Sequence, residues 1–145
     1  MFTHLLLPTD GSELSQAAIL KGLRFAKECN AKVTGVSVAP KFHVFTVNTT
    51  MLEDTNQQFL AESHAQTEKH LAMLRTAATE AGVPCDTVLE VSDHPYEAII
   101  HAAEQRGCDL IVMASHGRRG VQGLLLGSET QKVLTHTRIP VLVYR

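Results

Sequence analysis

Apolar runs alternate along this chain with stretches in which apolar residues recur every three or four positions. Short apolar runs bounded by glycine, proline or polar residues predict buried strands, and the longer spacing predicts amphipathic helices. The expected strands are residues 2–8, Lys32–Ala39, Cys85–Val91, Leu110–Ala114 and a last run from Pro140 to Tyr144. A helical pattern separates each strand from the next.

Local signals indicate where the first and longest helices begin and end. Ser12 is a candidate N-cap for the first helix. The longest helix is expected over residues 54–81, and Gly82 is suited to end it in a left-handed conformation. The stripe expected to face the core of this helix is Leu60, His64, Thr67, Leu71, Leu74, Ala78 and Ala81.

The two later helices carry end signals of their own. Pro95 suits the first turn of a helix that stops at Gly107. The last helix is expected from Ser128 to about His136, where Ser128 and Gln131 match a capping box.

Strand and helix alternation of this kind predicts an α/β fold, a single domain with a five-stranded parallel sheet and helices on both faces. Ligands of such sheets bind at the carboxyl ends of the strands, where the strand order reverses. We expect that point at the ends of the first and fourth strands, at Pro8, Thr9 and Asp10 and at residues 114–117.

Composition narrows the class of protein. The chain has 145 residues, enough for one domain, and a net charge of −2, which offers no electrostatic footprint for nucleic acid. No apolar run approaches the roughly 20 residues that cross a bilayer, and the start of the chain does not match a secretory signal. The three cysteines form no C-x-x-C pair, so we expect small buried thiols in a reducing, cytoplasmic setting.

The segment from Asp109 to Ser128 carries the main candidate chemistry. Its apolar run opens into a loop with glycines at 117, 120, 123 and 127 and then into the last helix. Small residues let backbone approach an anion, and the free N–H groups of a helix's first turn point at it. The segment therefore predicts a phosphate site.

The spacing Ala114-x2-Gly117-x9-Gly127-Ser128 resembles the nucleotide-binding signature of the universal stress protein family, in which the first position is glycine. Residues 8–12 (PTDGS), 108–117 (CDLIVMASHG), 124–128 (LLLGS) and the 139–143 strand (IPVLV) also resemble family motifs. The match covers nearly the whole chain and favours the ATP-binding subgroup.

The resemblance implies a Rossmann-like α/β sandwich, a homodimer, and ATP, possibly with Mg²⁺, as ligand. It implies that Asp10 and the Val38 backbone meet the adenosine half, and that the 114–117 turn, Gly127, Ser128 and Glu129 meet the ribose and phosphates. The implied binding residues are Pro8, Thr9, Asp10, Val38, Met113, Ala114, His116, Gly117, Gly127, Ser128 and Glu129.

Several of these residues have a competing structural interpretation. Asp10 is also suited to stabilise the turn before the first helix, Val38 to fill the core, and His116 to orient its loop. Ala114 fits the first signature position if the strand is extended there, but is strained if that position needs a positive φ. Glu129 suits a helix N-terminus but repels phosphates unless it points away or helps to hold Mg²⁺.

Three functions follow from these patterns. The first is a nucleotide-binding regulatory module. The second is a slow ATPase or phosphotransfer protein, with Asp10, His116 and Glu129 as the candidate catalytic groups. The third is a dimeric interaction protein without a nucleotide. The apolar segment at residues 41–53 is a candidate lid or partner contact, and the strand from Pro140 to Tyr144 a candidate dimer edge.

Overall fold

A computed structural model describes the backbone of residues 1–42, 49–116 and 126–145, and the side chains of these residues except 49–55. Part of the candidate lid segment (residues 41–53) lies outside the described residues, and so does Gly117. In chain order the elements are β1 (His4–Pro8), α1 (Glu13–Cys29), β2 (Lys32–Ala39), α2 (Thr49–Ala81), β3 (Cys85–Val91), α3 (Pro95–Arg106), β4 (Leu110–Ala114), α4 (Ser128–His136) and β5 (Val141–Tyr144).

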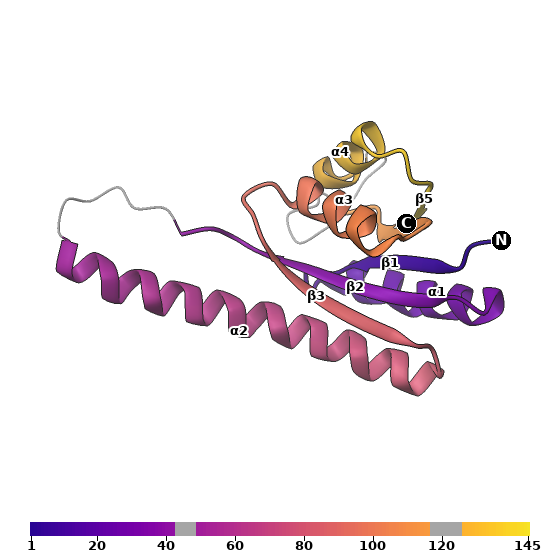
Figure 1. Cartoon of the computed structure of the whole chain (residues 1–145), viewed down its shortest axis with the longest axis horizontal. Coiled ribbons are helices and arrows are strands. Elements are labelled where there is room, and N and C mark those ends of the chain that lie inside the picture. The colour runs from indigo at the N-terminus through magenta and orange to yellow at the C-terminus, as the bar shows by residue number, and fades with distance from the viewer. Residues whose placement is uncertain (43–48, 117–125) are drawn as a thin grey trace.

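The five strands form one parallel sheet in the order β3-β2-β1-β4-β5 (Figure 1). This confirms the predicted fold class. The strand order reverses at β1, which pairs with β2 on one side and β4 on the other. The ends of the first and fourth strands therefore lie side by side, as expected.

Helices cover both faces of the sheet. On one face, α1 and α2 pack on residues such as Leu5, Leu7 and Val33. On the other face, α3 and α4 pack on Leu6 and on alternate residues of β2 and β4. The residues of β1, β2 and β4 are almost all buried because helices cover both faces of the sheet.

The longest helix, α2, begins five residues before the expected start, at Thr49. Four of the seven residues of its predicted stripe are buried, namely Thr67, Leu71, Leu74 and Ala78, whereas Leu60, His64 and Ala81 are only partly buried. Gly82 follows the helix with a φ of +72°. At about 50 Å the helix is longer than the strands, and its N-terminal part extends beyond the carboxyl edge of the sheet (Figure 1).

The three cysteines are free thiols, and Cys108 is buried. Burial raises the pKa of the Cys108 thiol to about 11. Cys108 therefore behaves as the small buried hydrophobe that the sequence predicts, whereas Cys29 and Cys85 are only partly buried.

Candidate functional site

A cleft of about 620 Å³ lies at the carboxyl ends of β1, β2 and β4. Ten of the eleven residues expected to bind nucleotide line it, and the eleventh, Gly117, lies outside the described residues. The ten are Pro8, Thr9, Asp10, Val38, Met113, Ala114, His116, Gly127, Ser128 and Glu129. The fold thus brings together residues from three separate parts of the chain.

The loop after β1 is fixed by hydrogen bonds on several sides. The Thr9 N–H donates to the Val36 carbonyl at 2.9 Å, and the Ser37 hydroxyl donates to the Thr9 carbonyl at 2.8 Å. The Asp10 carboxylate accepts from the Ser12 N–H at 3.0 Å. Asp10 therefore stabilises its own turn, as one interpretation expected, and it does so at the wall of the cleft.

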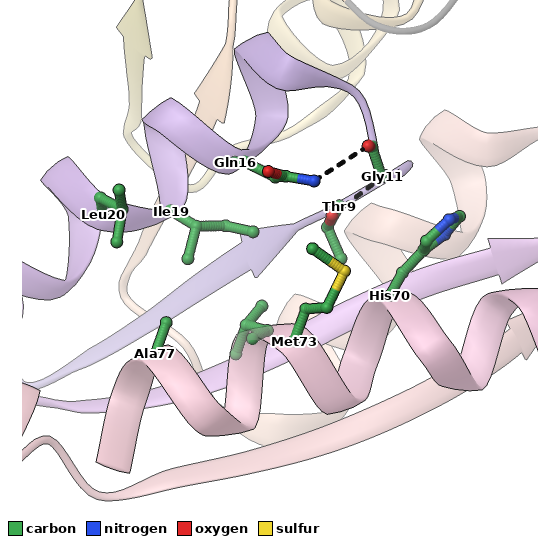
Figure 2. Close-up of a pocket in the computed structure, with 9 residues that line it drawn as sticks. Thr9, Gly11, Gln16, Ile19, Leu20, His70, Met73 and Ala77 are labelled. Carbon is green, nitrogen blue, oxygen red and sulfur yellow. Dashed lines mark hydrogen bonds between the residues drawn. The ribbon is translucent and has the colours of Figure 1, made fainter. Parts of the chain in front are cut away.

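Helices α1 and α2 hold the same loop at Gly11. The Gln16 side-chain amide donates to the Gly11 carbonyl at 3.2 Å, and the His70 ring of α2 lies against the Gly11 Cα (Figure 2). Gly11 has a φ of +79°, and a Cβ built there would lie 2.3 Å from His70 Nε2. Only glycine fits this turn. His70 lines both the cleft and a smaller cavity of about 140 Å³ between the two helices.

The end of β2 presents free backbone groups to the cleft. The backbone groups of successive β2 residues point alternately toward β3 and toward β1. Those of Val33 and Ala39 hydrogen bond on the β3 side, and the Val36 carbonyl accepts on the β1 side. The Val38 N–H and C=O therefore point toward β1. The pairing of β1 with β2 ends at Val36, and the Thr9 carbonyl accepts the Ser37 hydroxyl instead. Within the described residues, the Val38 backbone has no hydrogen-bond partner on that side.

Ala114 is the last residue of β4 and is extended. Among described residues other than glycine, a positive φ is found only at Asn30. The Ala114 carbonyl accepts from the Thr130 hydroxyl at 2.9 Å, which ties the strand end to α4. Alanine therefore fits the first signature position without backbone strain.

Gly127 lies at the α4 end of the cleft and closely approaches the end of β4. Its N–H donates to the Ser115 carbonyl at 2.7 Å, and a Cβ there would lie 3.0 Å from that oxygen and 3.2 Å from the His116 Cα. The Gly127 N–H, expected to face a phosphate, is thus committed to the protein here.

The start of α4 differs from the predicted capping box. Gly127, not Ser128, is the N-cap, and it provides no side-chain cap. The Gln131 side chain donates to the Leu126 carbonyl at 2.8 Å instead of reaching back to a Ser128 cap. Ser128 is the first helical residue, so the predicted bounds of the helix are confirmed and only the predicted cap is wrong. The N–H groups of Ser128, Glu129 and Thr130 open the helix and face no intrahelical acceptor.

The Glu129 side chain points toward α3. One carboxylate oxygen accepts from the Tyr96 N–H at 3.0 Å, and the other lies 3.4 Å from Lys132 Nζ. His94, the N-cap of α3, gives that helix no side-chain cap, so Glu129 supplies one from α4. The carboxylate is neutralised by a helix N-terminus and a lysine rather than left facing the cleft alone.

Comparison with known proteins agrees with this geometry. The model of the universal stress protein family matches residues 1–145. The chain belongs to the universal stress protein family. It is 32% identical over 149 residues to the universal stress protein YxiE of Bacillus subtilis, and the match covers all of both chains.

Solved structures of the family share the fold. Universal stress protein UspA from Lactobacillus plantarum superposes with a TM-score of 0.83 at 25% identity, over 99% of this chain and 98% of that one. A universal stress protein in complex with cAMP superposes with a TM-score of 0.70 at 22% identity, over 99% and 97% of the two chains. At least one protein of this fold therefore binds an adenine nucleotide.

One wall of the cleft is formed by residues outside the family motifs, and it was not predicted from the sequence. It is a stripe on α2 comprising Ser63, Gln66, Thr67 and His70. These residues continue the buried stripe of the helix but are polar. The change from apolar to polar at the same spacing is the signal that could have pointed to a cleft.

The described residues contain no cluster of three or more groups suited to a metal ion. None of the helices in the described part of the chain is long and apolar enough to span a bilayer.

Proposed function

We propose that this universal stress protein is a cytoplasmic regulatory module that binds an adenine nucleotide, ATP with Mg²⁺ as its counter-ion, in the cleft. The observation that carries the proposal is that one cleft has unpaired backbone groups at both ends. The Val38 N–H and C=O lie at one end, and the first-turn N–H groups of α4 lie at the other.

The Val38 end suits the base. Adenine offers a ring-nitrogen acceptor beside an amino donor, which a strand's N–H and C=O complement. The apolar Pro8, Ile99 and Met113 side chains line the same cleft and suit the faces of a purine. The complex of another family member with cAMP supports an adenine ligand.

The α4 end suits phosphate. The N–H groups of Ser128, Glu129 and Thr130, with the dipole of α4, favour negative charge. The Ser128 hydroxyl and the His116 ring line the same end. Because the Glu129 carboxylate is held by Tyr96 and Lys132, it need not face the phosphates.

We favour binding over turnover. Two of the three candidate catalytic groups are already engaged, Asp10 with the Ser12 N–H and Glu129 with the Tyr96 N–H. The third, His116, is buried, and its Nδ1 lies 3.1 Å from the Ser115 hydroxyl. These contacts favour a structural role for all three groups, so we propose that ATP acts as a ligand.

A thermal-shift titration of nucleotide-free protein tests the proposal. Ligand at 100 times its Kd stabilises the folded state by about 2.7 kcal/mol, which should raise Tm by roughly 5–10 °C for a domain of this size. We expect this with ATP and smaller shifts with GTP, each measured with and without Mg²⁺. No shift with millimolar ATP, ADP or AMP would contradict the proposal and favour a dimeric interaction protein without nucleotide.

We further propose that β5 pairs with its counterpart in a second copy of the chain. β5 bonds to β4 on one side only, and its four residues are half-buried and apolar apart from the Tyr144 hydroxyl. An apolar edge strand of this kind is stabilised by pairing.

Val143→Glu should convert the homodimer to a monomer, because it places a charge in the paired edge. Light scattering measures the mass, and Leu134→Glu on α4, where Leu134 is 41% exposed, is the matched control. A Val143→Glu protein that stays folded and dimeric would rule out this edge as the interface.

A further inference from the structure

The polar stripe of α2 faces the base end of the cleft, and two contacts fix its position. Leu74 packs against Gly35 of β2, where a Cβ would lie 2.7 Å from the Leu74 Cδ1, and His70 packs against Gly11. Helix α2 is therefore antiparallel to β2, and its N-terminal part lies toward the carboxyl end of that strand. From Gly35 to Val38 the strand advances about 10 Å, or about seven residues of helix.

This register places Gln66 and Thr67 of α2 beside the end of β2, where the Val38 N–H and C=O are unpaired. Thr67 is buried, and its hydroxyl donates to the Ser63 carbonyl at 2.7 Å. Gln66 is exposed and lines the cleft. Among the described residues, its side-chain amide has no hydrogen-bond partner. Of the stripe, Gln66 therefore presents both a free donor and a free acceptor at the base end.

We propose that Gln66 determines the base preference of the cleft by pairing with the N6/N7 edge of adenine. This inference rests on the proposed nucleotide binding. The Gln66 Oε1 accepts one hydrogen of the adenine amino group, and its Nε2 donates to N7. The Val38 backbone meets the neighbouring N1/N6 edge, so the two hydrogens of the amino group have separate acceptors.

Guanine cannot make the same pair. Its corresponding edge carries two acceptors, O6 and N7, so one would face the Gln66 Oε1 without a hydrogen between them. A bidentate amide–adenine pair of this kind discriminates against the wrong base by about 5- to 150-fold. Gln66 is a specificity-determining residue in this account, while the phosphates are held elsewhere, at α4.

The test combines a change in the protein with a change of one ligand atom. Three proteins are compared: the wild type, Gln66→Leu and the control Gln57→Leu, which lies on the same helix but does not line the cleft. Each is titrated calorimetrically with ATP, GTP and 7-deaza-ATP, in which N7 is replaced by carbon. The wild type should bind ATP about fivefold more tightly than 7-deaza-ATP. Gln66→Leu should bind ATP about tenfold more weakly than the wild type, bind these two ligands equally, and lose most of the preference over GTP. Gln57→Leu should match the wild type.

The outcomes separate this inference from the proposed function. If the wild type binds no adenine nucleotide, the proposed function fails. If the wild type binds ATP but Gln66→Leu keeps the full difference between ATP and 7-deaza-ATP, the role of Gln66 is wrong and nucleotide binding stands. Equal weakening of ATP and GTP would also overturn base selection by Gln66. Because Gln66 is exposed, an unchanged Tm should show that the variant is folded.

Discussion

Replacing Gly11 with alanine should lower the free energy of unfolding by about 2–4 kcal/mol. The left-handed backbone at a φ of +79° disfavours any side chain by about 1 kcal/mol. The new methyl group would also overlap the His70 ring, and overpacking of this kind costs about 1–3 kcal/mol more. Urea denaturation followed by circular dichroism measures the change. Asp10 lies on the same loop and lines the cleft, so displacing the loop should also reduce the thermal shift with ATP.

Gly82 provides the matched control for Gly11. It has a similar φ of +72°, but nothing lies within 4 Å of a Cβ built there. Gly82→Ala should therefore cost only about 1 kcal/mol. Adding His70→Ala to Gly11→Ala should recover part of the extra loss, since it removes the overlapping ring. Equal losses for the two glycines would show that the contact between His70 and the loop does not constrain the fold.

Replacing Leu74 with alanine should lower the free energy of unfolding by about 2–5 kcal/mol, measured in the same way. The side chain is 1% exposed and holds α2 against the sheet at Gly35, so its loss leaves a cavity between the two. Met73, the preceding residue, is 45% exposed, and Met73→Ala should cost much less. A small effect of Leu74→Ala would mean that α2 packs on the sheet without the Leu74 side chain.

The contact between Leu74 and Gly35 also predicts non-additive energies. Gly35→Ala alone should destabilise the protein, because the new methyl group would meet Leu74 at both terminal carbons. In the Leu74→Ala background the same methyl group fills vacated space. The double variant should therefore be more stable than the sum of the single changes predicts.

The strands could be predicted closely because buried parallel strands are rich in apolar residues and are bounded by glycine, proline or polar residues. Lys32–Ala39, Cys85–Val91 and Leu110–Ala114 begin and end in the structure at the predicted residues. The gathering of Pro8, Thr9, Asp10 and Ala114 at one cleft followed from strand order, which the alternation of elements strongly restricts.

What the sequence could not show depends on how elements approach one another. Ser128 has the chemistry of an N-cap, but it is the first helical residue, and the N-cap is Gly127, whose N–H donates to the Ser115 carbonyl. The polar stripe of α2 is visible in the sequence, but its place beside the end of β2 depends on the packing of Leu74 against Gly35, which is far away in sequence. Glu129 caps a different helix from its own, which no local pattern indicates.

The central position of β1 has a consequence for the order in which the chain acquires structure. Leu5 pairs with Leu110, so one edge of β1 has no partner until more than a hundred further residues have been synthesised. Until then, a nascent chain in which β2 has paired with both β1 and β3 exposes the other edge of β1. Such an apolar strand edge is prone to aggregation and to chaperone binding. Such non-local pairing is also slow to form. Chains released before β4 should therefore aggregate, whereas loss of β5 alone leaves both edges of β1 paired.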